Sequence, residues 1–374
     1  MNKRLFGPSL YYASDKNIFD ALIQHKVNIP TIADLFLRRN VIVGRKTPRD
    51  ELARYFARLS HDFSDHKVIA SRLGVAPRKE RTTSMDVEGI TEENLQAALT
   101  ELKNELEAAG DVVQLTREVD RIKANIQYTR FDYRRSEFSQ LQVRDGEIEF
   151  VKSNGVYRVR NSQNEYINDV RDSLLGKIGK LSSEPLKRSE VSLFTVPSAE
   201  LRSKFFHELI SNLPGYIRKD VSEVYVYKKK PEKAASRDVD GESVEDSHDD
   251  GHVERVFLRG NGVTRSQILS ELLSERKYYI IKVVWTVLET MGRGHVYEIE
   301  ALFQDYEECS GFSFLLAGVY VLEDGGLHSS KRRGPLREEA EIISKAIEAK
   351  SRLLMTAMQK EYSDELEADR KGAL

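Results

Sequence analysis

The chain has 374 residues, 40% of them hydrophobic and 32% charged, and its formal net charge is −2, a composition typical of a highly charged globular protein of two or three domains. The single cysteine, Cys309, excludes an internal disulfide framework and any metal site built from several cysteines, and it indicates a reducing compartment. The longest apolar runs, 278–288 and 312–322, are too short to span a bilayer, so we expect a cytoplasmic protein with no membrane partner.

Charge is distributed unevenly along the chain. Residues 1–80 contain 15 Lys and Arg against 8 Asp and Glu, whereas residues 238–254 contain 8 acidic residues and neither Lys nor Arg. A basic region on an otherwise balanced protein can bind a phosphate backbone by releasing counterions, which gives strongly salt-dependent affinity with little sequence preference. The N-terminal region is therefore the first candidate for a nucleic-acid contact.

Residues 28–58 have the pattern of two short helices joined by an extended basic segment. Ile32, Leu35 and Phe36 lie at helical spacing, and Asn40 stands where a left-handed residue would close the first helix. The Thr47-Pro48 pair predicts the start of a second helix, since a hydroxyl can cap it and proline fits its first turn. The β-branched run 41–43 between them is expected to stay extended.

This segment resembles the SAP-like, helix-extended-helix family of small DNA-binding modules, although Asn40 stands where the family usually has glycine. The residues that match the family pattern are Asp34-Leu35, Arg38-Arg39, Gly44, Arg45-Lys46 and Glu51-Leu52. The resemblance covers under a tenth of the chain and implies DNA contact. The residues expected to make this contact are Arg38, Arg39, Arg45, Lys46 and Arg49. The alternative is that these cations merely solvate the outer face of a small helical domain.

The predicted fold class is α+β, with largely antiparallel sheets and a long C-terminal helix. The expected parts are a basic helical module at 1–80, a helix plus β-hairpin domain at 81–182, and a strand-helix-strand core at 183–374, with an acidic loop at 231–254 and a final helix at 335–366.

The middle part contains helix signals at both ends and strand signals between them. Thr91 predicts the start of one helix, with Gly110 past its end, and 164–178 predicts another. The expected strands are 126–135, 141–143, 147–152 and 156–160, with turns at Asp145-Gly146 and Asn154-Gly155. Residues 75–89 and 181–190 are expected to be linkers.

The C-terminal part contains two similar segments at an offset of 63 residues, beginning at Leu201 and Thr264. Each is a predicted helix with a strand on either side, at 191–196 and 222–227 for the first and at 256–259 and 278–288 for the second. A duplication and a chance similarity of two amphipathic helices both explain the match. The helix at 335–366 has a narrow, heptad-like apolar stripe, which fits packing within the chain or a homo-oligomeric seam.

Four sets of residues could serve chemistry or binding. Arg202 and His207 resemble the Arg-x4-His motif of HEPN ribonucleases, but residues five apart on a helix point about 140° away from each other. His61-Asp62, with His66, resembles the metal-binding dyad of HD phosphohydrolases, yet lacks recognisable partner ligands.

The other two sets are turns or strands that could bind anions. Gly260, Gly262 and Thr264 lie between a predicted strand and helix, where amides can hold an anion or simply form a tight turn. A second basic surface is predicted from interleaved rings and guanidinium groups, which an edge strand protected by charge would also show. Its residues are Arg130, Tyr133, Arg134 and Arg135.

These patterns favour a DNA-associated binding or adaptor protein, with DNA and a protein as partners and no cofactor or metal. A nuclease or nucleotide-handling enzyme within a multi-protein system is one alternative, and a scaffold that binds only proteins is another. Glu298 and Glu300, which alternate with apolar residues, are expected to form the solvent side of a strand.

Overall fold

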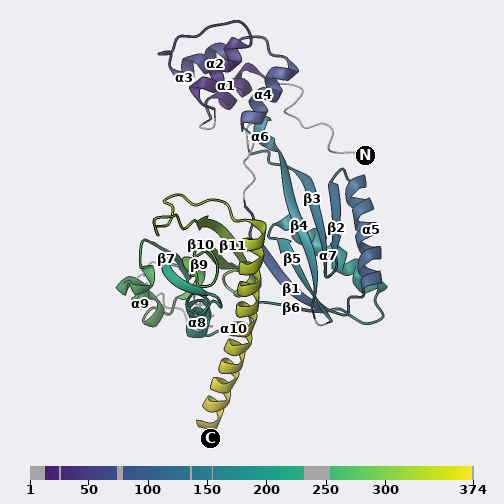
Figure 1. Ribbon diagram of the computed structural model, residues 1–374, viewed down its shortest axis with the longest axis vertical. Coiled ribbons are helices and arrows are strands. Elements are labelled where there is room, and N and C mark those ends of the chain that lie inside the picture. Colours follow the sequence, from purple (N-terminus) through teal and green to yellow (C-terminus); the bar gives the residue numbers. More distant parts are fainter. Residues whose placement is uncertain are drawn as a thin grey trace, which may run out of the picture. The chain divides into compact units, whose positions relative to one another are not determined.

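The computed structural model describes residues 13–24, 27–73, 79–134, 137–153, 155–230 and 253–372. Within these ranges the chain is an α+β protein with mostly antiparallel strands and a long C-terminal helix, which confirms the predicted fold class (Figure 1). The chain divides into two compact units. The first comprises Met1–Arg78, Gly89–Tyr157 and Asn164–Leu186, and the second comprises Lys79–Glu88, Arg158–Gln163 and Lys187–Leu374.

The first unit begins with a small helical module. Its helices are α1 (Asp15–Leu22), α2 (Ile29–Leu37), α3 (Arg49–Ala57) and α4 (Phe63–Leu73). They enclose an apolar core to which Leu22, Ile32 and Phe56 contribute fully buried side chains. Phe138 of the short helix α6 (Glu137–Gln140) joins the same core. The module therefore has a hydrophobic centre of its own, and its charged residues are left to the surface.

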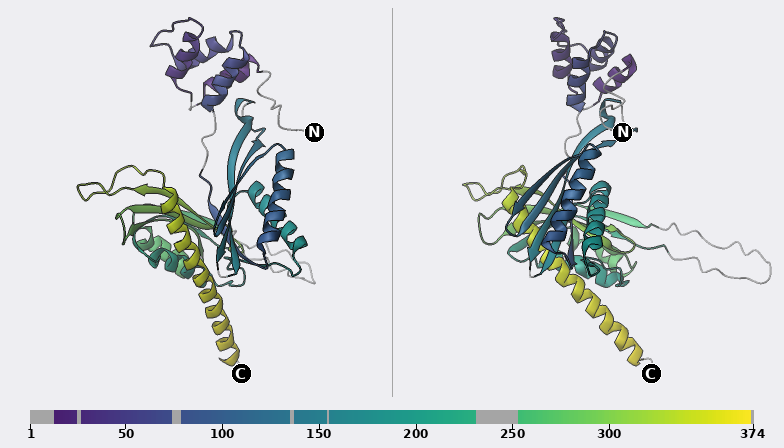
Figure 2. Two further views of the ribbon diagram at one scale, coloured as in Figure 1. Left: turned by 45° about the vertical axis from the view of Figure 1, so that its right-hand side comes forward. Right: turned by 90° about the vertical axis from the view of Figure 1, so that its right-hand side faces the viewer.

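The rest of the first unit is a three-stranded antiparallel meander with two helices. The strands are β2 (Val112–Glu118), β3 (Arg121–Phe131) and β4 (Leu141–Ser153), and the helices are α5 (Glu92–Ala108) and α7 (Glu165–Leu181). The two helices pack against each other, as Figure 2 shows. The Thr91 and Asn164 side chains cap them by accepting from the backbone amides of Asn94 and Ile167, which confirms the predicted starts.

The second unit is an antiparallel sheet with helices on one face. Its strands follow the order β5-β1-β11-β10-β9-β7-β8, and β6 also pairs with β1. Their bounds are β1 (Thr82–Glu88), β5 (Val156–Ser162), β6 (Lys187–Glu190), β7 (Tyr216–Tyr227), β8 (Arg255–Arg259), β9 (Tyr279–Glu289), β10 (Val296–Asp305) and β11 (Ser310–Tyr320). The helices are α8 (Ala199–Ser211), α9 (Gln267–Ser274) and α10 (Arg337–Gly372), and α8 and α10 cover the main core.

Several predicted elements are wrong in ways that packing explains. The expected linkers contain β1 and β6, because β1 buries Thr83, Met85 and Val87 on alternate positions although its sequence is largely polar. The predicted turn at Asp145-Gly146 lies inside β4. A Cβ on Gly146 would lie 2.4 Å from Ile167 Cγ1, so the glycine serves the close approach of α7 to the strand.

The duplicated segments also differ from the prediction. Residues 191–196 form no strand, although Leu193 N donates to Cys309 O at 2.9 Å and its side chain is buried. The expected helix at Thr264 is a 3₁₀ turn, η1 (Val263–Arg265), and α9 begins at Gln267. The C-terminal helix occupies the predicted region and extends to Gly372. The acidic segment 231–252 lies outside the described residues.

In the sheet of the second unit, the face opposite α8 and α10 carries paired charges. Arg81 Nε contacts Glu300 Oε1 at 2.7 Å, and Lys282 Nζ contacts Glu300 Oε2 at 3.0 Å. Arg332 pairs with Glu298 by crossing over Gly318, where an added Cβ would lie 2.6 Å from Arg332 Cδ. Burial would raise the pKa of Glu300, but hydrogen bonds from the two cations outweigh it and lower the pKa. The two glutamates are thus neutralised within the protein.

A buried ion-pair network fixes α10 to the other face of this sheet. Arg160 donates from Nε and Nη2 to the two carboxylate oxygens of Glu348, both at 2.7 Å, and the Glu348 side chain is 1% exposed. Arg158 donates to Asp86 at 2.9 Å, and Arg352 Nε lies 2.9 Å from the same carboxylate. Residues of β5, β1 and α10 therefore meet in one network of charge-assisted bonds.

The network makes a prediction about stability. Glu348→Ala should lower the free energy of unfolding of the second unit by roughly 3 to 5 kcal/mol, because it leaves Arg160 buried without its carboxylate. Denaturant titration followed by the fluorescence of the single tryptophan, Trp285, measures this, since its side chain is fully buried in that unit. Glu365→Ala, at an exposed position of α10, is the matched control. Equal midpoints for the two variants would contradict the role of the network.

Candidate nucleic-acid interface in the N-terminal helical module

Helix α2 ends in a Schellman motif centred on Asn40. This residue has φ 58°, its amide donates to Leu37 O at 2.9 Å, and the Val41 amide donates to Phe36 O at 3.0 Å. The left-handed conformation predicted for Asn40 is confirmed. The motif satisfies the last carbonyls of α2 and turns the chain into the extended segment 41–44 that leads to α3.

Helix α3 starts differently from the prediction. Pro48 is its N-cap and no side chain caps the helix, so Thr47 does not supply the expected hydroxyl. Asp50 and Glu51 occupy the first turn instead, where negative charge is favourable beside the free amides. The segment from α2 to α3 is nevertheless helix, extended connection and helix, in the predicted order.

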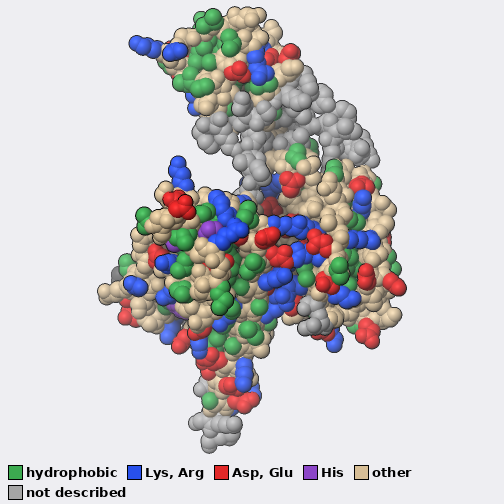
Figure 3. Space-filling view, viewed as in Figure 1, with side chains coloured by type: hydrophobic (Ala, Val, Ile, Leu, Met, Phe, Trp, Pro, Cys, Tyr) green, Lys and Arg blue, Asp and Glu red, His purple; other side chains and the backbone are tan. Residues whose placement is uncertain are grey.

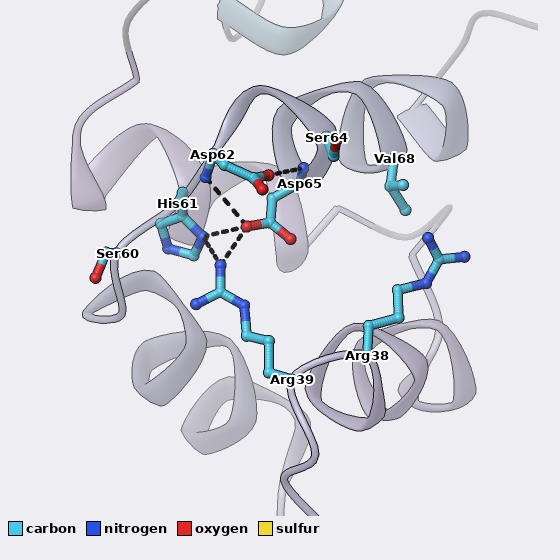
Figure 4. A pocket seen from close by; sticks show the side chains of 8 residues that line it. All are labelled: Arg38, Arg39, Ser60, His61, Asp62, Ser64, Asp65 and Val68. Atoms are coloured by element: carbon cyan, nitrogen blue, oxygen red, sulfur yellow. Dashed lines mark hydrogen bonds and ion pairs between the residues drawn. The ribbon is translucent and has the colours of Figure 1, made fainter.

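Arg39 is engaged inside the module. Its guanidinium forms an ion pair with Asp65 of α4, and Nη2 lies 3.1 Å from His61 Nδ1 (Figure 4). The guanidinium carbon also lies 4.9 Å from the centroid of the Phe56 ring. The ion pair, the hydrogen bond and the ring contact thus engage the charge, an N–H group and the flat face of the Arg39 guanidinium. Arg39 therefore links the end of α2 to α3 and α4, and we do not include it among the residues offered to DNA.

A shallow hollow of about 560 Å³ lies around this cluster. Its lining residues are Arg38, Arg39, Ser60, His61, Asp62, Ser64, Asp65 and Val68. Asp62 and Asp65 cap the start of α4 reciprocally, since Asp65 N donates to Asp62 Oδ1 at 2.8 Å and Asp62 N to Asp65 Oδ2 at 3.2 Å. The amides of Asp62 and Asp65 at this helix start are therefore occupied by the chain's own carboxylates.

The predicted dyad of His61 and Asp62 with His66 is not assembled for metal binding. His61 faces Arg39, whereas His66 packs edge-on against Phe138 with ring centroids 5.7 Å apart. No group of three or more His, Cys, Asp or Glu side chains within the described residues could hold a metal ion. Burial, followed by the charge of Arg39, lowers the pKa of His61, and Asp65 opposes this shift.

Arg49 and Arg38 are also bonded within the module. Arg49 Nη2 donates to the carbonyl oxygens of Leu22, at 2.9 Å, and Gln24, which ties the start of α3 to the end of α1. Arg38 pairs with Asp34 one helical turn earlier, at 3.1 Å, and Figure 4 shows it apart from the Arg39 cluster. An exposed pair of this kind contributes little to stability and can exchange for a phosphate.

Four exposed cations of the module lie on the connection, on α3 and directly after it. Arg45, Lys46, Arg54 and Arg58 are exposed, and none of their side chains makes a hydrogen bond or ion pair within the described part of the chain. Arg54 and Arg58 were missed in the sequence, although their spacing of four places them on one face of a helix. Tyr55, 71% exposed, lies between them in the sequence.

Exposed apolar side chains accompany these cations. Ile42 is 89% exposed in the extended connection, and Leu37, at the end of α2, is 60% exposed. Figure 3 shows Lys and Arg side chains projecting from the edge of this module, beside hydrophobic side chains on the same face. A surface that combines free cations with uncovered apolar groups is suited to binding a large partner.

The described arginines of the predicted second basic surface lie close to acidic residues of the first unit. Arg130 lies 3.9 Å from Glu165, Arg134 lies 3.5 Å from Asp132, and Tyr133 is 75% exposed. Arg135 lies outside the described residues. The described cations of this set are each accompanied by a carboxylate, and β3, which carries Arg130, lies between β2 and β4 and so is not an edge strand.

The predicted anion turn already contains a carboxylate. Gly262 has φ 66°, and its amide donates to Asp220 Oδ1 at 2.8 Å. Thr264 lies in the 3₁₀ turn, and Gly260 N donates to Ser222 O at 3.0 Å. Since acceptors of the chain itself occupy these two amides, the glycines serve the backbone turn.

Arg202 and His207 do not form a pair on α8. Arg202 donates to Val196 O at 2.7 Å and Glu307 O at 2.9 Å, and its guanidinium carbon lies 4.8 Å from the Tyr279 ring centroid. Burial lowers the pKa of His207, and the nearby charge of Arg218 adds to this shift. The two side chains thus have separate surroundings, and Arg202 organises backbone carbonyls.

Comparison with protein-family models and with curated proteins found no match. Each helix within the described residues is too short or too polar to cross a membrane.

The surroundings of His61 predict a pH dependence. Because the folded state lowers its pKa from 6.5, the unfolded chain takes up a proton first as pH falls, and the module loses stability below about pH 6.5. His61→Asn retains an acceptor for Arg39 but does not titrate. Thermal unfolding followed by circular dichroism at pH 7.5 and 5.5 should therefore show a smaller pH-dependent drop for this variant. Equal pH-dependent drops in the unfolding temperature of the natural protein and of His61→Asn would refute the assignment of this pH dependence to His61.

Proposed function

We propose that this protein is a DNA-associated binding protein whose N-terminal helical module contacts the phosphate backbone. The observation that carries the proposal is that Arg45, Lys46, Arg54 and Arg58 are exposed and have no hydrogen-bond or ion-pair partner among the residues that the structure describes, while Arg39 and Arg49 are bonded within the module. Binding of this kind releases counterions from the duplex and depends steeply on salt. The resemblance of 28–58 to SAP-like modules supports the same assignment.

The geometry separates arginines that are bonded within the module from cations that are exposed at its surface, which supports the proposal. Arg39 and Arg49 hold α1, α2, α3 and α4 together, so the connection between α2 and α3 has a defined course. Arg45 and Lys46 lie on that connection and project from a supported backbone. Fewer conformations must therefore be lost when these side chains bind a phosphate.

An adaptor role is the second candidate, because the exposed Ile42 and Leu37 fit a protein partner as well as DNA. Salt dependence separates the two, since an apolar contact changes little between low and moderate salt. The separate environments of Arg202 and His207 favour neither a nuclease nor another enzyme, and we do not extend the proposal to catalysis.

Lys46→Gln tests the proposal directly. Fluorescence anisotropy of a labelled DNA duplex should show about fivefold weaker binding near 0.15 M salt, and the slope of log affinity against log salt should become shallower by about 0.9. Lys16→Gln is the matched control, since Lys16 is an exposed cation on α1 that pairs with Asp20. The proposal fails if duplex binding is absent, or if the two variants bind equally well.

A further inference from the structure

A second surface that combines exposed arginines with an exposed aromatic ring lies on β8, the last strand in the sheet of the second unit. Strand β8 presents Arg255, Phe257 and Arg259 on one side, and all three are exposed, whereas Val256 and Leu258 between them pack toward the core. The strand is the last in the sheet order of its unit. A ring with a guanidinium two residues away on either side is therefore displayed at the sheet edge.

Phe257 packs beside a second ring on the neighbouring strand. It lies opposite Tyr225 of β7, with ring centroids 4.3 Å apart at an interplanar angle of 30°. Lys282 of β9 lies opposite Tyr225 in turn, with its ammonium 5.0 Å from the ring centroid. Tyr225 thus has a side-chain neighbour on both adjacent strands, β8 and β9, while Phe257 remains 46% exposed. The outward part of the Phe257 ring is free for another planar group.

The flanking guanidinium groups are positioned for a charged partner. Arg255 lies with its guanidinium carbon 4.0 Å from the Tyr306 ring centroid, which orients it. The Arg259 side chain is 72% exposed and lies 3.4 Å from Glu223, and an exposed pair of this kind is weak enough to exchange for a phosphate. Each is about 7 Å along the strand from Phe257, given a rise of 3.3–3.4 Å per residue. Phosphates on both sides of one nucleotide could meet these two groups.

Charge on this face favours a polyanion. Its cations are Arg81, Arg255, Arg259, Lys282 and Arg332, and its acids are Glu223, Glu298 and Glu300, each of which is paired with one or two of these cations. Cations therefore outnumber acids in this set, and the most exposed of them flank the free ring. A duplex keeps its bases stacked on one another, whereas a single strand can place a base on an aromatic side chain.

We propose that the Arg255-Phe257-Arg259 face of β8 binds single-stranded nucleic acid, with a base stacked on Phe257 and the adjacent phosphates contacted by Arg255 and Arg259. Tyr225 of the adjacent strand β7 supports the ring, and Lys282 of β9 contacts Tyr225 in turn. This site is independent of the N-terminal module, because it uses different residues in the other unit of the chain. It binds by stacking and charge without reading a base sequence.

The ring is tested with the full-length protein and a fluorescein-labelled 20-residue oligo(dT). Phe257→Ala should weaken binding by roughly five- to a hundredfold, the effect of losing one base-aromatic stack. Phe194→Ala is the matched control, since Phe194 is a 60% exposed phenylalanine of the same unit. Equal losses in both variants, or none in either, would overturn the proposal. The buried Trp285 reports whether each variant is folded.

The phosphate contacts are tested by salt dependence. Arg259→Gln should make the slope of log affinity against log salt shallower by about 0.7, the value for one contact to a single strand. Arg293→Gln, at an exposed position between β9 and β10, should leave the slope unchanged. Identical slopes for the two variants would contradict a phosphate contact at Arg259.

A direct readout comes from Phe257→Trp, because the natural chain has one tryptophan and that residue is buried. The new exposed indole should retain oligo(dT) binding, and its fluorescence should be quenched as a base stacks on it; unquenched fluorescence at saturation would refute stacking. Every measurement is repeated in Lys46→Gln. If the effects at Phe257 persist there, the β8 site stands whether or not the N-terminal module binds duplex DNA, and if they vanish the β8 site is refuted.

Discussion

The buried pair of Arg160 and Glu348 constrains how α10 packs in the second unit. Taking both charges out of water is costly, and the cost is recovered only when the two groups meet in bidentate geometry with their remaining donors and acceptors satisfied. Arg158, Arg352 and Asp86 supply that surrounding set. An apolar stripe alone would allow α10 to shift by a turn. The ion pairs remove this freedom and fix one register of the helix against β1 and β5.

Local signals predicted most helices and failed where burial depends on distant partners. Thr91, Asn164 and Asn40 each carry their function in their own side chain or backbone preference, so their positions could be found in the sequence. Strand β1 could not, because its polar residues become a strand only by pairing with β11 and β6. Gly146 was misassigned as a turn residue for the same reason, since its small size is required by a helix that follows β4 in the chain.

The candidate DNA surface shows the corresponding limit for charged residues. Composition identified the basic region, but an arginine that contacts a phosphate and an arginine that ties helices together have the same appearance in a sequence. Arg39 and Arg49 belong to the second kind because acceptors on α4 and after α1 reach them. Arg54 and Arg58 remain at the surface since α3 turns that side away from the core. The assignment of each cation therefore required the positions of its carboxylate and carbonyl neighbours.

The discontinuous course of the chain has a consequence for its biosynthesis. Thr83 of β1 donates to the carbonyl of Phe312, a residue 229 positions further on, and β1 belongs with the unit that contains α10. As the polypeptide leaves the ribosome, the segment emerges long before the strand that completes its ladder. The first unit can fold from the segments before and after β1 while β1 is still unpaired. The second unit is completed late and through contacts of large sequence separation, so we expect it to fold more slowly than the first.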